Sequence, residues 1–146
     1  MIYETITKQI LHKMGISKKY IGFDYIVSSI VLISENENIL HELNKVLYVD
    51  IAKLYNTTPY SVERNIRYAI HKAWSTSNNN SYIMRIIFGD CLKCSRISNK
   101  LFLELLYEYI RQYNNFKSLF STNYMCPILD CKCEIYDRII DHLLEL

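Results

Sequence analysis

Residues 46–74, VLYVDIAKLYNTTPYSVERNIRYAIHKAW, restrict the fold more than any other stretch of this sequence. Apolar residues in its second half recur at steps of three and four, the spacing of one face of an α-helix. These apolar positions are Val62, Ile66, Ala69, Ile70, Ala73 and Trp74. The residues on the opposite side are mostly charged or aromatic. The stretch therefore predicts an amphipathic helix with a cationic face outside the core.

The start of this helix is marked by Thr58 and Pro59. A threonine oxygen can accept a free amide hydrogen at the N-cap, and proline suits the first helical position, where its missing N–H costs nothing. A short apolar helix precedes it, and Asn56 tolerates the left-handed conformation that a tight turn requires. This is the outline of a helix-turn-helix, whose second helix enters the DNA major groove. Many helical hairpins share the outline.

The remaining sequence also favours helices, because three glycines and two prolines in 146 residues leave few β-turn signals. The apolar run 23–33 suits a buried strand or a helix; its length favours helix, and its β-branched residues favour strand. Helices are predicted at 2–14, 23–33, 39–46, 82–88, from 98 or 99 to beyond 113, and at 135–146. We expect connections at 16–22, where Gly22 breaks the chain, an irregular segment at 90–99, and a loop at 121–127.

The central block KVLYVDIAKLYNTTPYSVERNIRYAIHKAW resembles the C-terminal effector domain of the stage-zero sporulation protein A family of transcription regulators. The features that match are LY-x-DIAK, NTT, VER-x-IR and AI-x-x-AW, and the likeness extends from about residue 6 to about residue 100. The resemblance implies that Glu63, Arg64 and Arg67 lie on the recognition helix and touch DNA. Four positions differ from the family pattern. Ser61 replaces an arginine, Tyr68 a histidine, and Pro59-Tyr60 two small residues.

The polar side of the predicted helix carries side chains suited to DNA. Arginine can pair with guanine through two hydrogen bonds, glutamate can accept from cytosine, and Tyr or Ser can hold a phosphate. The predicted DNA-binding residues are Thr58, Tyr60, Ser61, Glu63, Arg64, Arg67, Tyr68, His71 and Lys72. The alternative is a solvated face on which Glu63 and Arg67 form a surface ion pair worth about 0.3 to 0.5 kcal/mol. The loss of an arginine at position 61 predicts weaker binding or a shifted target sequence.

The net charge of +2 does not by itself indicate a nucleic-acid partner. Its distribution is informative, because residues 45–72 carry an excess of Lys and Arg and residues 130–145 an excess of Asp and Glu. Scattered histidines, with no nucleophile pattern or glycine-rich phosphate loop, argue against an enzyme. Thirteen tyrosines sit mostly at core spacing, which favours packing over base stacking.

Five cysteines raise the question of a metal site. Cys91 and Cys94 form a C-x-x-C pair, and Cys126, Cys131 and Cys133 follow about thirty residues later. Zinc takes four such ligands in a tetrahedron. The second group has unusual spacing, however, and one cysteine is surplus. Reduced thiols, some of them buried, are therefore favoured over zinc, and no other cofactor is expected.

We expect an all-α fold, a compact helical bundle containing a helix-turn-helix at 1–100, with a C-terminal helical hairpin at 101–146 packed on it. The expected function is sequence-specific binding of double-stranded DNA by a stand-alone regulator that lacks the phosphorylated receiver domain of its relatives. A protein-interaction module that modulates another regulator is the alternative. The hairpin is a candidate surface for a homodimer or another transcription regulator. No secretory signal and no membrane span are visible in the sequence. We therefore expect a cytoplasmic location.

Overall fold

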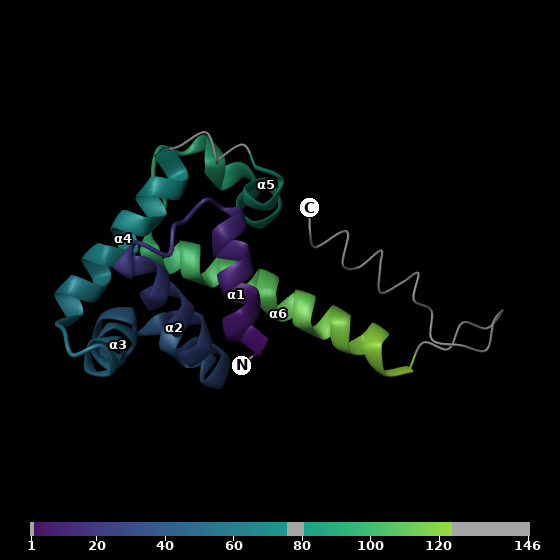
Figure 1. The fold of residues 1–146 in the computed structure, drawn as a ribbon, viewed down its shortest axis with the longest axis horizontal. Coiled ribbons are helices and arrows are strands. Elements are labelled where there is room, and N and C mark those ends of the chain that lie inside the picture. The colour runs from purple at the N-terminus through teal and green to yellow at the C-terminus, as the bar shows by residue number, and fades with distance from the viewer. Residues whose placement is uncertain (1, 76–80, 124–146) are drawn as a thin grey trace. The chain divides into compact units, whose positions relative to one another are not determined.

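A computed structural model of the chain describes residues 2–75 and 81–123, with side chains described up to residue 115. The described residues form helices and turns with no strand, which confirms the predicted all-α fold. The elements (Figure 1) are α1 Ile2–Lys13, α2 Ile21–Glu35, the 3₁₀ turn η1 Glu37–His41, the π-helical turn η2 Leu43–Leu47, α3 Tyr48–Leu54, α4 Pro59–Ser75, α5 Tyr82–Phe88, the 3₁₀ turn η4 Gly89–Lys93 and α6 Asn99–Asn123.

The chain divides into two compact units, Met1–Glu108 and Tyr109–Leu146. The candidate site lies wholly in the first unit. The predicted division into domains at residue 100 stays a prediction. Of the predicted C-terminal hairpin, the first helix corresponds to α6, and the helix predicted at 135–146 lies outside the described residues. Because α6 continues to Asn123, the predicted loop was placed too early at Ser121.

The core of the first unit is built around α2 and α4. Helix α2 packs against both α1 and α4, and α3 packs against α4. An aromatic row then links α4 to the helices that follow it. The Trp74 and Phe88 rings meet edge to face with centroids 5.1 Å apart, and Phe88 stacks on Phe102 at 5.0 Å. These contacts bury the apolar stripe of α4 completely and fix the orientation of its polar side.

Gly22 does not break the chain, contrary to the sequence prediction. It lies inside α2, which begins at Ile21. A side chain there would have a Cβ 2.1 Å from the Asn65 carbonyl oxygen and 2.9 Å from the Ala69 Cβ. Glycine is therefore needed at this position because α2 and α4 approach so closely. A close approach of backbones and a chain break both use glycine, so the sequence alone did not separate them.

The helix predicted at 39–46 was also wrong. Two short turns, η1 and η2, replace it, because the backbone leaves the helical conformation at Glu42 with φ −130° and ψ 46°. Both Ile39 and Leu47 are nevertheless buried. The apolar spacing had correctly indicated which residues face the core, and two turns satisfy it as one helix would.

The other helix predictions that fall on the described residues agree with the structure. The ambiguous run 23–33 is helical, and α1 and α5 end at glycines with positive φ, 80° at Gly15 and 47° at Gly89. The segment 90–99 contains only the short turn η4 before α6 begins. Ser98 caps α6, since its hydroxyl oxygen accepts the Leu101 N–H at 3.1 Å. Among the described helices, none combines the length and apolar character that crossing a bilayer requires.

Candidate nucleic-acid interface

Helix α4 begins as the sequence predicts. Thr58 Oγ1 accepts the Ser61 N–H at 3.2 Å, and Pro59 is the first helical residue. Asn56 has a positive φ of 52°, and the Thr57 N–H closes the turn onto the Ala52 carbonyl at 2.9 Å. The turn between α3 and α4 is thus set by hydrogen bonds and by one residue that accepts the left-handed conformation. The predicted helix-turn-helix geometry is present.

The predicted site residues lie on the side of α4 opposite its buried stripe, but they differ in exposure. Tyr60 is 70% exposed and Tyr68 48%. Four more are exposed, namely Thr58, Arg64, Arg67 and His71. The remaining three, Ser61, Glu63 and Lys72, are half-buried. The exposed strip is therefore narrower than the helical spacing alone suggests.

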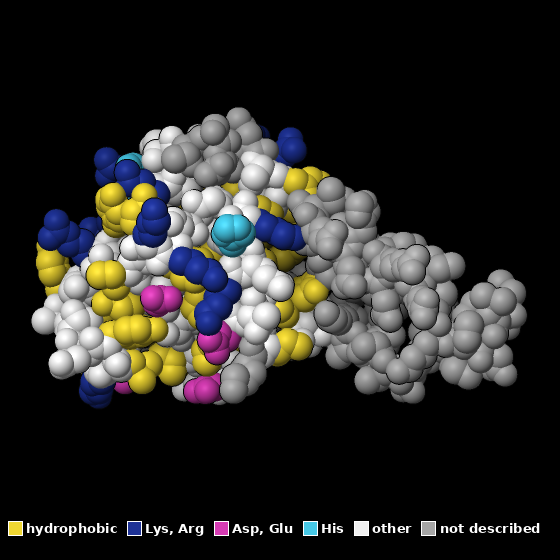
Figure 2. Space-filling model, viewed as in Figure 1, with side chains coloured by type: hydrophobic (Ala, Val, Ile, Leu, Met, Phe, Trp, Pro, Cys, Tyr) yellow, Lys and Arg dark blue, Asp and Glu magenta, His cyan; other side chains and the backbone are white. Residues whose placement is uncertain are grey.

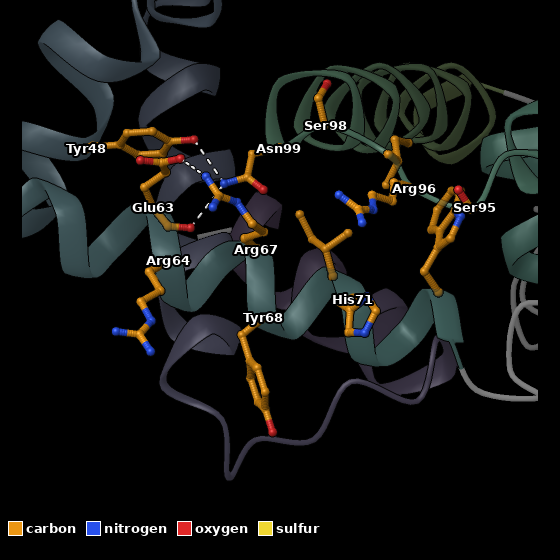
Figure 3. Close-up of a pocket in the computed structure, with 13 residues that line it drawn as sticks. Tyr48, Glu63, Arg64, Arg67, Tyr68, His71, Ser95, Arg96, Ser98 and Asn99 are labelled. Atoms are coloured by element: carbon orange, nitrogen blue, oxygen red, sulfur yellow. Dashed lines mark hydrogen bonds and ion pairs between the residues drawn. The ribbon is translucent and has the colours of Figure 1, made fainter.

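An open groove of about 790 Å³ runs beside α4 (Figure 3). Five of the predicted residues line it: Glu63, Arg64, Arg67, Tyr68 and His71. The opposite wall is formed by the segment 95–99, which the sequence analysis did not assign to the site. Tyr60, Ser61, Arg64 and Tyr68 also border a smaller hollow of about 400 Å³. The structure thus brings most of the predicted face together around α4.

Glu63 and Arg67 form the ion pair that the solvated-face alternative describes. The Arg67 side chain is 66% exposed and the Glu63 side chain 31%. An exposed pair of this kind contributes little to stability, so the guanidinium can exchange its partner at small cost. By contrast, Arg64 makes no ion pair with any residue that the structure describes. In Figure 3 its side chain points away from the other labelled residues.

Tyr68 borders the groove at its edge, and its ring extends with Lys72 toward the other flank of α4, where the connection between α1 and α2 passes. The Tyr68 ring meets the Tyr20 ring edge to face at 5.5 Å. The Lys72 ammonium lies 5.2 Å from the centre of the Tyr68 ring, a cation–π distance. Figure 3 shows Tyr68 directed toward this connection, away from Arg96 and Asn99. Tyr68 therefore positions both Lys72 and the neighbouring segment.

Asn99 and Tyr48 are site residues that the sequence did not reveal. The Asn99 side-chain amide donates to the Tyr48 hydroxyl and to the Glu63 carbonyl oxygen, each at 3.2 Å. Burial raises the pKa of the Tyr48 phenol. The sequence predicts Asn99 only as an alternative helix cap. Its contacts lie 51 and 36 residues away in sequence, and no local pattern indicates them.

Cations predominate around α4. In Figure 2, Lys and Arg side chains lie along the edge of the molecule that α4 forms and also over the middle of this face, and the acidic side chains visible in that view lie in its lower half. Among the residues that line the groove, Glu63 is the one carboxylate, and Arg67 already pairs with it. The groove consequently offers a positive environment to an anionic ligand.

The cysteines contribute no described site. Cys91 is half-buried, Cys94 is exposed, and Cys126, Cys131 and Cys133 lie outside the described residues. Within residues 2–75 and 81–115, no three potential ligands of a metal ion gather.

Comparison with models of known protein families gives one match that spans most of the chain. Residues 7–110 match the family described as sporulation initiation factor Spo0A C terminal. The matched range includes α3, α4 and both walls of the groove. It also contains the central block on which the sequence resemblance was based.

Proposed function

Because the chain belongs to the family of sporulation initiation factor Spo0A C-terminal domains, a family of DNA-binding domains and not of enzymes, we propose that it binds duplex DNA sequence-specifically through α4 and regulates transcription. The observation that carries the proposal is the open cationic face of this helix. Its apolar side is fully buried, while Arg64, Arg67 and His71 remain exposed.

The chemistry of this face suits direct reading of bases. In a helix-turn-helix, side chains near the start of the second helix meet base edges. Arg64 and Arg67 each carry a planar fork that can pair with guanine O6 and N7, and Glu63 can accept from a cytosine amino group. The Ser61 hydroxyl already accepts from the Asn65 amide at 3.3 Å, and it keeps its own hydrogen to donate to a phosphate.

The domain is competent to bind DNA without a phosphorylated partner domain. The exposure of the α4 face among the described residues supports this part of the proposal, since no rearrangement is needed to uncover it. Two copies bind neighbouring DNA boxes and meet through residues 101–146. Measuring the mass of the complex on a two-box fragment tests this last point, and a strict monomer on that DNA would refute it.

The test of DNA binding uses fluorescence anisotropy with a labelled 30-base-pair duplex. Replacing Arg64 or Arg67 by Ala should cost roughly 1 to 3 kcal/mol and relax base preference if the residue meets a base, or reduce the salt slope by about one if it meets phosphate. Arg85 on α5 is the matched control, because it is exposed and does not line the groove. Unchanged binding for both α4 variants would refute the proposal.

A protein-interaction module that modulates another transcription regulator is the second candidate. One observation favours it: the Glu63–Arg67 ion pair occupies part of the reading face. This candidate predicts weak DNA binding that does not depend on Arg64 or Arg67. Steep salt dependence together with a sequence preference would exclude it.

A further inference from the structure

Two segments outside the helix-turn-helix carry unpaired cations beside α4, one on each flank. On the first flank, Arg96 is exposed and lines the same groove as Arg64 and Arg67. On the second, Lys18 and Lys19 are exposed in the connection between α1 and α2. None of these three makes an ion pair with a described residue. Figure 3 shows Arg96 extending from its segment toward α4.

The Arg96 flank is fastened to α4 at both of its ends. The Trp74 indole N–H donates to the Cys94 carbonyl oxygen at 3.0 Å. At the other end, the Asn99 amide donates to the Glu63 carbonyl oxygen at 3.2 Å. Trp74 and Glu63 are eleven residues apart on α4, which corresponds to about 16 Å along the helix axis. The segment therefore runs beside three turns of α4, and the backbone that carries Arg96 is already ordered.

The lysine flank is held in a comparable way. The Lys19 N–H donates to Ser17 Oγ at 3.2 Å, and the Tyr20 N–H donates to the Ser17 carbonyl oxygen at 3.1 Å. Tyr20 then contacts Tyr68 of α4 through the edge-to-face pair. The two hydrogen bonds order the connection itself, and the ring contact holds it against the side of α4 opposite Arg96. Ordering before binding lowers the entropy lost when a ligand is held.

The dimensions of DNA give both flanks a role. A helix with its side chains is about 10 to 12 Å wide and the major groove about 12 Å, so an inserted helix fills the groove. Protein surfaces on either side of that helix then face the two sugar–phosphate strands that border it. Half or more of protein–DNA hydrogen bonds go to the backbone, and these contacts set position without reading sequence.

We propose that Arg96 on one side and Lys18 with Lys19 on the other form a phosphate clamp that grips both DNA strands bordering the groove in which α4 lies. The proposal rests on DNA binding through α4 and deepens it. The clamp determines affinity and register, while the α4 side chains determine base preference.

The clamp is tested by measuring the dissociation constant from 50 to 200 mM KCl on two labelled 30-base-pair duplexes, one selected from a random pool and one scrambled. Each phosphate contact contributes about 0.9 to the salt slope, and hence roughly a three- to fourfold change in affinity across this range. Arg96→Ala should reduce the salt slope by about one. A Lys18→Ala, Lys19→Ala double variant should reduce it by about one to two, according to whether one or both lysines contact phosphate. Circular dichroism verifies that each variant is folded.

Three comparisons decide the outcome. The ratio of affinities for the selected and scrambled duplexes should stay within about twofold for the clamp variants, because phosphate contacts carry no sequence information. Arg96→Lys should retain most of the slope, and the Arg85→Ala control all of it. Wild-type slopes in both clamp variants would overturn the clamp while leaving α4 binding intact. A wild-type protein without salt-dependent binding would overturn the clamp and the proposed function together.

Discussion

Replacing Gly22 by Ala should destabilise the protein, although alanine is the better helix former. Gly22 is the second residue of α2, so helix propensity alone would favour alanine there by less than the roughly 1 kcal/mol that applies in a helix interior. The structure predicts a loss. The added Cβ would lie 2.1 Å from the Asn65 oxygen and 2.8 Å from the Asn65 carbonyl carbon.

The magnitude follows from what has to move. Both Asn65 atoms belong to the backbone of α4, so no side-chain rotation relieves the overlap, and α2 and α4 must separate. Overpacking of this kind typically costs about 1 to 3 kcal/mol. Because the propensity gain in the first turn of α2 is small, most of this cost remains, and we expect a net loss of about 1 to 2 kcal/mol. Because α4 shifts, DNA affinity should also fall.

Urea unfolding followed by circular dichroism measures this loss directly. Gly89→Ala is an informative comparison, because no atom lies within 4 Å of its added Cβ while its φ of 47° strains any side chain. That variant should lose stability through backbone strain of about 1 to 3 kcal/mol, with DNA affinity unchanged. A Gly22→Ala protein as stable as the wild type would refute the close approach of α2 and α4.

The remaining predictions concern the cap, the buried phenol and the cysteines. Thr58→Ala should lower the free energy of unfolding in urea by about 1 kcal/mol, because the Ser61 N–H loses its acceptor. Thr58→Ser should keep most of the wild-type stability, because its hydroxyl can accept the same hydrogen bond. The pKa of Tyr48 is raised above 10.0, so its stabilisation is present below that pH and is lost as pH rises above it; Tyr48→Phe should flatten the fall of unfolding free energy above about pH 10. A profile identical to the wild type would contradict this. Protein purified without chelator should contain no stoichiometric zinc in elemental analysis, and one zinc per chain would establish the cysteine site instead.

The sequence predicted the parts of the fold that depend on local rules. The buried stripe of α4 follows from helical spacing, and the turn before it follows from Asn56, Thr58 and Pro59, whose conformational preferences are strong. Each of these features is decided within a few residues. The stripe and the turn can therefore be predicted without knowing which helices pack against α4.

The parts that the sequence did not predict depend on distant contacts. Gly22 looked like a chain break because its reason, the Asn65 backbone, lies 43 positions later in the chain. The bond between Asn99 and Tyr48 spans 51 residues, and the bonds from Asn99 to Glu63 and from Trp74 to Cys94 place a whole segment beside α4. Arg96 became part of the candidate site only through that placement. Local patterns thus indicated the reading helix, and tertiary packing supplied its flanks.

Selection of bound sequences from a random duplex pool tests the central claim most directly, because it measures binding and base preference together. The account predicts enrichment of a defined box by the wild-type protein and loss or change of that box when Arg64 and Arg67 are both replaced by Ala. Recovery of no shared sequence by the wild type, or of the same box by the double variant, would contradict the claim that α4 reads DNA.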